Sequence, residues 1–149
     1  MHRTISLSEY VKKRNGVALG APGSMSNMLK RSLGASSFYL FWQYWNPIWG
    51  YYLVRNVMKP FSQLLPTWLA TIMTFAVSGG LHDLAVTVLK WQLTFFITPW
   101  FVIMSILVLF TKKFNISYDK YRWLIRASLN IIFIAACLSL TMLLDSRYA

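Results

Sequence analysis

The chain has 149 residues, of which 56% are hydrophobic and 17% aromatic, and its formal charge of +11 comes from 15 basic and four acidic residues. Long apolar runs with few charges need lipid around them, so the composition indicates a membrane protein and argues against a soluble domain. The basic residues fall between the apolar runs, as the positive-inside rule describes. This distribution predicts a lipid bilayer as partner and no nucleic acid.

Residues 1–37 are predicted to form a basic cytoplasmic N-terminal segment and linker, without the apolar region of a signal peptide. Ser6 and Glu9 have the spacing of a capping box, which predicts a short basic helix that ends at Gly16. That helix either lies on an anionic membrane surface or is a solvated tail. The stretch that follows is rich in glycine and serine, and it predicts a loop with one further short helix over residues 25–33.

Residues 38–60 are dense in tryptophan and tyrosine and begin a membrane domain that extends over residues 38–149. About 20 residues are enough to cross a bilayer. However, Pro47 interrupts the backbone hydrogen bonds in the middle of the block, and its aromatic residues prefer the membrane–water interface. We therefore predict two short re-entrant or interfacial helices with a hinge at Asn46 and Pro47, instead of one straight span.

Three apolar stretches predict about three transmembrane helices, over residues 67–89, 91–111 and 123–144. Together with the aromatic helices they predict an all-α integral membrane protein. Most basic residues lie before the first span or between the second and third spans. The positive-inside rule therefore places the N-terminus in the cytoplasm and the C-terminus on the extracytoplasmic side.

A stripe of polar residues recurs at helical spacing on the first predicted span and consists of Thr71, Thr74, Ser78 and His82. Small and hydroxyl residues often serve only to pack helices together, which accounts for Thr74 and Ser78. It does not account for His82, because an imidazole needs partners for both ring nitrogens. Ser78 lies one turn before His82, within reach of its side chain.

Asp83 follows His82 directly, so on a helix the two side chains point about 100° apart. Asp83 is expected to face Lys90, two turns further on the same side. One histidine beside one aspartate offers too few ligands for a metal ion, and we predict no metal site.

Two groups of residues resemble the motifs of the membrane-bound O-acyltransferase family. The first group is Ser37, Phe41-Trp42, Trp45 and Asn46, and the second is Ser78-Gly79-Gly80-Leu81-His82-Asp83. The resemblance covers about residues 35–90, just over a third of the chain. Family members are usually several times longer, and their additional spans build the tunnel in which acyl donor and acceptor meet.

The resemblance implies an O-acyltransferase that moves an acyl group from a cytoplasmic acyl thioester to a hydroxyl acceptor. His82 is then the general base, and Asn46 donates a hydrogen bond to the developing oxyanion or orients the acceptor. The residues expected to bind substrate are Trp42, Trp45, Ser78 and Thr74. Acyl-CoA or another acyl thioester is the expected co-substrate, with no cofactor.

An alternative interpretation follows from the shortness of the chain compared with that family. A chain that has kept the family fold and lost its tunnel is expected to be a non-catalytic, small membrane subunit of a larger complex. Under both interpretations we expect a homo-oligomer or a second membrane subunit that completes the tunnel. The physical reason is that the aromatic block exposes a large apolar area, which lipid or protein must cover.

Overall fold

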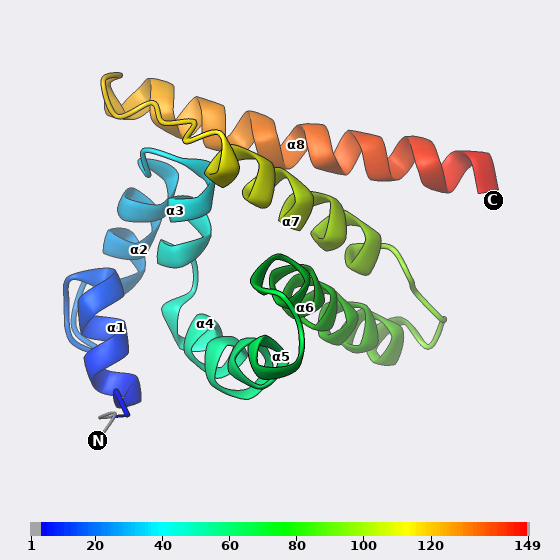
Figure 1. Cartoon of the computed structure of the whole chain (residues 1–149), viewed down its shortest axis with the longest axis horizontal. Coiled ribbons are helices and arrows are strands. Elements are labelled where there is room, and N and C mark those ends of the chain that lie inside the picture. The colour runs from blue at the N-terminus through cyan, green and yellow to red at the C-terminus, as the bar shows by residue number, and fades with distance from the viewer. Residues whose placement is uncertain (1–3, 149) are drawn as a thin grey trace.

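The computed structural model of the chain describes residues 4–148, and within them all regular structure is helical (Figure 1). This confirms the predicted all-α class. The elements are α1 (Leu7–Asn15), α2 (Ser24–Leu33), α3 (Phe38–Tyr44), α4 (Pro47–Leu53), the π-helix η1 (Val54–Met58), α5 (Lys59–Leu64), α6 (Thr67–Lys90), α7 (Ile97–Lys113) and α8 (Trp123–Tyr148).

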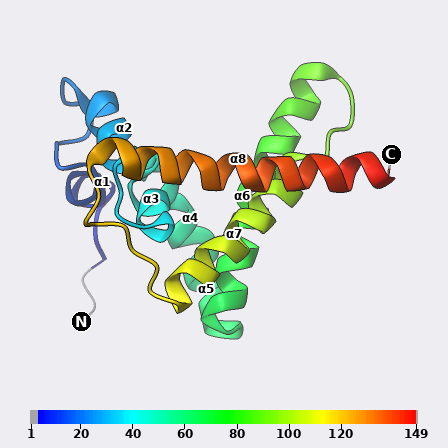
Figure 2. The same cartoon turned by 90° about the horizontal axis from the view of Figure 1, so that it is seen from above.

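The N-terminal segment forms the short helices α1 and α2, which lie together at one end of the molecule (Figures 1 and 2). The predicted capping box of α1 is present. The Ser6 hydroxyl accepts from the Glu9 amide at 3.3 Å, and the Glu9 carboxylate accepts from the Ser6 amide at 3.0 Å. Gly16 ends α1 with a φ of 80°, as predicted. α1 is not a solvated tail, because its residues Val11 and Asn15 are buried.

The aromatic block bends between α3 and α4, which confirms the predicted hinge. Asn46 adopts a left-handed φ of 41°, and α4 begins at Pro47. Proline fits the first turn of a helix because its missing N–H would have no partner there. The chain then continues through η1 and α5 as one helical arc (Figure 1). The wider turn of η1 comes just before Pro60, which cannot donate the hydrogen bond of a regular helix.

Within residues 4–148, two helices are long and apolar enough to cross a membrane, α6 and α8 as far as Arg147. α7 has 17 residues and is about 25 Å long, whereas the hydrocarbon core of a bilayer is about 30 Å thick. The second predicted span began at Trp91, but α7 begins only at Ile97. The reason is that Trp91 ends α6 with a φ of 55°, and residues 91–96 form a connection. A third membrane span therefore stays a prediction.

α6 and α7 form an antiparallel pair, and α7 lies between α6 and α8, which crosses the pair (Figures 1 and 2). The pair approaches closely at Gly79. A Cβ atom added there would lie 2.7 Å from the Thr98 Cα and 3.1 Å from the Phe101 Cβ, closer than Cβ atoms normally come to their neighbours. Only a glycine fits this position, so Gly79 of the second motif has a packing role.

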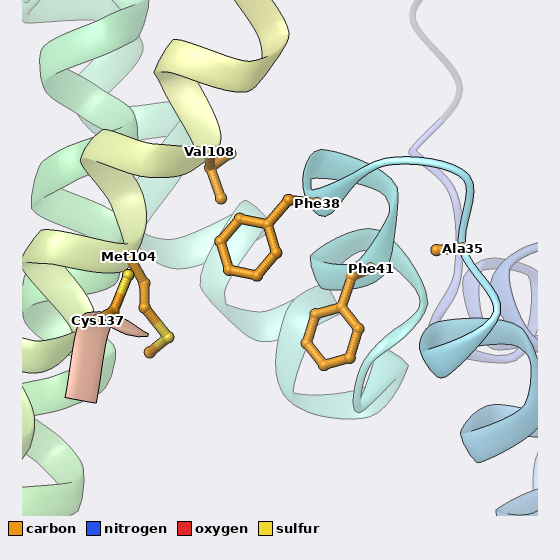
Figure 3. Packing of buried hydrophobic residues seen from close by; sticks show 6 residues of the cluster. All are labelled: Ala35, Phe38, Phe41, Met104, Val108 and Cys137. Atoms are coloured by element: carbon orange, nitrogen blue, oxygen red, sulfur yellow. The ribbon is translucent and has the colours of Figure 1, made fainter. Parts of the chain in front are cut away.

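The apolar core lies where α3 meets α7 and α8. Figure 3 shows its six buried residues, Ala35, Phe38, Phe41, Met104, Val108 and Cys137. Phe38 and Phe41 of α3 are only 0% and 2% exposed. The start of the aromatic block is thus covered by protein. Because α3 is anchored in the core, its position limits where the rest of the block can lie.

Asn130 joins α8 to the connection between α2 and α3 through a buried hydrogen-bond network. Its Nδ2 donates to the carbonyl oxygens of Leu33 at 2.7 Å and Ala35 at 3.1 Å. Its Oδ1 accepts from the Tyr118 hydroxyl, and burial raises the pKa of that hydroxyl. Trp123 adds a bond from its Nε1 to a carbonyl oxygen of α2 at 2.9 Å. The first half of α8 is therefore tied to the connection between α2 and α3.

Candidate functional site

A cavity of about 650 Å³ opens between α1, α3, α4, α6 and α7. It is lined by all six side chains that the sequence predicted as site residues, namely His82, Asn46, Trp42, Trp45, Ser78 and Thr74. The two sequence motifs thus meet at one place, although they lie on different helices. A cavity of this size is in the usual range for a small-molecule site.

His82 lies on α6, and its Nδ1 is 2.6 Å from the backbone carbonyl oxygen of Ser78. Because a carbonyl oxygen only accepts hydrogen bonds, this contact assigns the proton of the neutral imidazole to Nδ1. Nε2 then keeps a free lone pair, and no other group within residues 4–148 bonds to it. The ring is flanked by Trp49 and Phe101, with centroid distances of 6.0 Å and 5.3 Å. The exposed side chain therefore presents an oriented proton acceptor at the cavity.

Trp49 of α4 connects the predicted site residues, and sequence analysis missed it. Its backbone N–H donates to Asn46 Oδ1 at 3.2 Å, and its Nε1 donates to Ser78 Oγ at 3.0 Å. Its ring meets the ring of His82 edge-on. The signal that would have found it is its position three residues after Asn46, where a helix offers a backbone N–H to its capping residue.

Only one of the two polar atoms of the Asn46 side chain makes a hydrogen bond within residues 4–148. Oδ1 caps α4 through the bond to Trp49. No hydrogen bond involves Nδ2 within the part of the chain that the structure describes, and the side chain is exposed at the cavity. Asn46 therefore keeps an N–H donor that can meet an oxygen atom of a bound molecule.

The polar stripe on α6 lines the cavity, but its hydroxyl groups are already bonded within the protein. The Ser78 hydroxyl accepts from Trp49, and the Thr74 hydroxyl donates to the Ala70 carbonyl oxygen at 2.7 Å. The group of Ser78 that contacts His82 is its backbone carbonyl, not its hydroxyl. Ser78 thus positions the neighbouring rings, and Thr74 forms part of the wall.

Trp42 and Trp45 of the first motif supply aromatic walls. Trp42 lies edge-on to Phe75 at 5.3 Å and beside Phe101 at 6.0 Å, measured between ring centroids. Trp45 stacks on Phe41 at 5.6 Å. These rings give the cavity a mostly apolar lining, which suits an acyl chain.

Asp83 is buried and does not face Lys90, so that expectation was wrong. Its carboxylate oxygens accept from the backbone N–H groups of Phe96, Ile97 and Thr98 and from the Thr98 hydroxyl, at 2.7–3.1 Å. The first N–H groups of a helix have no partner within the helix, and the helix dipole also stabilises a negative charge at this end. Asp83 therefore fixes the start of α7, outside the cavity lining.

Arg14 of α1 also lines the cavity, which the sequence did not predict. Its Nη1 donates to Gln43 Oε1, and its guanidinium carbon lies 5.1 Å from the centroid of the Tyr10 ring. The basic N-terminal helix is therefore part of the candidate site. Its predicted position on a membrane surface stays a prediction.

Among the described residues, no three histidine, cysteine, aspartate or glutamate side chains gather where they could hold a metal ion. The predicted absence of a metal and of a cofactor stays a prediction. What the cavity does contain is one imidazole, one free amide donor and one guanidinium in an aromatic surround.

Comparison with known proteins finds no matching family model, no matching curated protein and no matching solved structure. The case for any function therefore comes from the residues of the cavity and their geometry.

Proposed function

We propose that the chain is a membrane O-acyltransferase that moves an acyl group from a cytoplasmic acyl thioester to a hydroxyl acceptor, with His82 as general base. The observation that carries the proposal is the bond from His82 Nδ1 to the Ser78 carbonyl oxygen, which leaves Nε2 free as a proton acceptor. A neutral imidazole accepts protons efficiently near pH 7. Residues of both motifs that resemble the membrane-bound O-acyltransferase family line the same cavity as His82.

The proposed reaction needs one proton acceptor and one hydrogen-bond donor. Nε2 of His82 takes the proton of the acceptor hydroxyl while the hydroxyl oxygen attacks the thioester carbonyl carbon. The negative charge that develops on the carbonyl oxygen is stabilised by the free N–H of Asn46. When the resulting intermediate collapses, the C–S bond breaks and the new C–O bond stays in the ester product. His82 then gives the proton to the leaving thiolate. Acyl-CoA or another acyl thioester is the co-substrate.

A substitution of His82 tests the proposal directly. We expect His82→Ala, in nanodiscs, to slow transfer of a labelled acyl group at least about 100-fold, because general-base catalysis contributes about 10²–10⁴ in rate. The melting temperature should stay close to that of the wild type. Leu81→Ala is the matched control, since Leu81 is the preceding residue of α6 and does not line the cavity. Unchanged turnover in His82→Ala would end the acyltransferase proposal.

The membrane placement is part of the same proposal. In Figures 1 and 2, α1, α2 and the connection between α7 and α8 lie at one end of the molecule. The C-terminal end of α8 and the connection between α6 and α7 lie at the other end. The first end carries most of the basic residues, whereas the second carries only Lys90 and Arg147. The positive-inside rule then favours a cytoplasmic N-terminus and an extracytoplasmic C-terminus in a lipid bilayer.

A second candidate function is that of a non-catalytic subunit of a larger membrane complex. It is favoured by the apolar side chains of the connection between α6 and α7, where Trp91, Leu93 and Phe95 are 91%, 93% and 68% exposed. Lipid or another subunit must cover such a surface. Under this proposal a homo-oligomer or a second membrane subunit completes the cavity. Purified protein that transfers no acyl group, but co-purifies with one stoichiometric membrane protein, would favour this candidate.

A further inference from the structure

The polar groups of the cavity lining are unbalanced toward positive charge and hydrogen-bond donors. Arg14 is the one permanently charged residue in the lining, and no aspartate or glutamate joins it there, within the part of the chain that the structure describes. Two donor atoms of lining residues, Arg14 Nε and Trp42 Nε1, are buried without a partner in that same part. Asn46 Nδ2 is a third donor without one. The two buried donors, on Arg14 and Trp42, lower stability until an acceptor meets them.

Arg14 is held in place without being neutralised. Its Nη1 donates to the uncharged Gln43 side chain, and its guanidinium faces the Tyr10 ring. The side chain is half-buried, so its charge is less screened than on an open surface. A guanidinium in such a position matches the oxygen atoms of a carboxylate or a phosphate.

The shape of the site separates this charge from the imidazole. α1, which carries Arg14, and α6, which carries His82, lie on either side of α3 and α4 (Figures 1 and 2). Between them, the lining is largely aromatic and aliphatic. A molecule that fills the cavity therefore meets a cation on one side and an apolar wall beyond it.

We propose that the cavity binds an amphiphile whose single anionic head group, a phosphate or a carboxylate, is held by Arg14 while its alkyl or acyl chain lies along the aromatic wall. This inference rests on the proposed function, because it names the class of substrate that the same cavity takes. Arg14 is then a binding residue for the head group, whereas His82 takes the proton of the acceptor hydroxyl.

The head-group site is tested with three ligands that differ in their head group and have hydrocarbon chains of the same length. Native mass spectrometry of the full chain in a non-ionic detergent would measure Kd for dodecyl phosphate, dodecanoate and uncharged dodecanol. We expect the wild type to bind at least one of the two anions more tightly than dodecanol, and the tighter anion shows whether phosphate or carboxylate is preferred. Arg14→Gln should raise Kd for that anion about ten- to hundredfold, the usual range for a hydrogen bond to a charged group.

Two controls make the result decisive. Dodecanol should bind Arg14→Gln as it binds the wild type, which shows that the cavity is still formed. Lys13→Gln should leave all three Kd values unchanged, because Lys13 is the neighbouring exposed cation of α1 and does not line the cavity. The proposal is wrong if Arg14→Gln alters no Kd, if it weakens dodecanol as much as the anions, or if the wild type binds dodecanol as tightly as both anions.

The assay measures binding and not turnover, so its outcome is independent of the acyltransferase proposal. A protein that transfers no acyl group but shows the Arg14-dependent preference for anions keeps the head-group site. If the protein transfers acyl groups through His82 but the Arg14→Gln variant binds the anions as tightly as the wild type, the head-group proposal is wrong and the acyltransferase proposal stands.

Discussion

Asn46 caps α4 with its Oδ1 and, in the proposed reaction, stabilises the oxyanion with its Nδ2. A pair of substitutions separates these two roles. Asn46→Asp keeps an oxygen that can cap α4 but replaces the Nδ2 donor by a second oxygen. We expect this variant to melt near the wild-type temperature and to transfer acyl groups about 10²–10³-fold more slowly. Asn46→Ala should be equally slow and also about 1 kcal/mol less stable, because the cap is lost. Full turnover in Asn46→Asp would show that Nδ2 has no part in catalysis.

The two neighbouring glycines of the second motif differ in their surroundings, which gives a matched pair of variants. A Cβ atom on Gly79 would collide with the backbone of α7, whereas one on Gly80 would meet only the Thr98 Oγ1, at 3.8 Å. We expect Gly79→Ala to cost about 1–3 kcal/mol of stability through overpacking. Gly80→Ala should be neutral or slightly stabilising, since alanine favours a helix. Chemical denaturation of both variants checks this, and equal stabilities would contradict the close approach.

Among the helices, α7 depends most clearly on a single distant side chain. Asp83 satisfies three backbone N–H groups and one hydroxyl at its start. We expect Asp83→Ala to lower the unfolding free energy by at least about 2 kcal/mol, because one buried donor without a partner costs about 1–3 kcal/mol. Asp145→Ala is the control, since Asp145 is exposed on α8. Similar melting temperatures for the two variants would show that the cap contributes little.

The sequence predicted those helices whose boundaries are set locally. The capping box placed α1, Pro47 placed the start of α4, and a long, mostly apolar run placed α6 almost to the residue. The start of α7 was predicted six residues too early because four of the six residues from Trp91 to Phe96 are apolar or aromatic and continue the hydrophobic pattern of the helices on either side. What ends α6 and starts α7 is the left-handed Trp91 and the carboxylate of Asp83, and neither is visible in hydrophobicity.

Two residues of the candidate site could be predicted from the sequence, and two could not. His82 and Asn46 stood out because a polar group among apolar residues is costly and needs an explanation. Trp49 and Arg14 did not, because one is a tryptophan among many and the other a cation in a basic tail. Their roles arise from contacts between α4 and α6 and between α1 and α3, and such long-range packing has no local signature.

For the molecule as a whole, the proposed orientation predicts which loops face which compartment. In cysteine-labelling experiments on intact cells, we expect Ser146→Cys to react with an impermeant thiol reagent and Ser117→Cys to be protected. Both positions are exposed in the isolated chain, so a difference between them must come from the membrane. The wild type is the control, because Cys137 is buried in the core. Labelling of position 117 from outside would reverse the orientation.

The lining of the cavity also gives the protein an optical property. Four of its seven tryptophans line that one space, Trp42, Trp45, Trp49 and Trp100. Indole emission moves to shorter wavelength when water beside the ring is replaced by apolar atoms. A molecule that enters the cavity therefore shifts the fluorescence of the unlabelled protein, and a titration followed by this shift measures the fraction of cavities that are occupied.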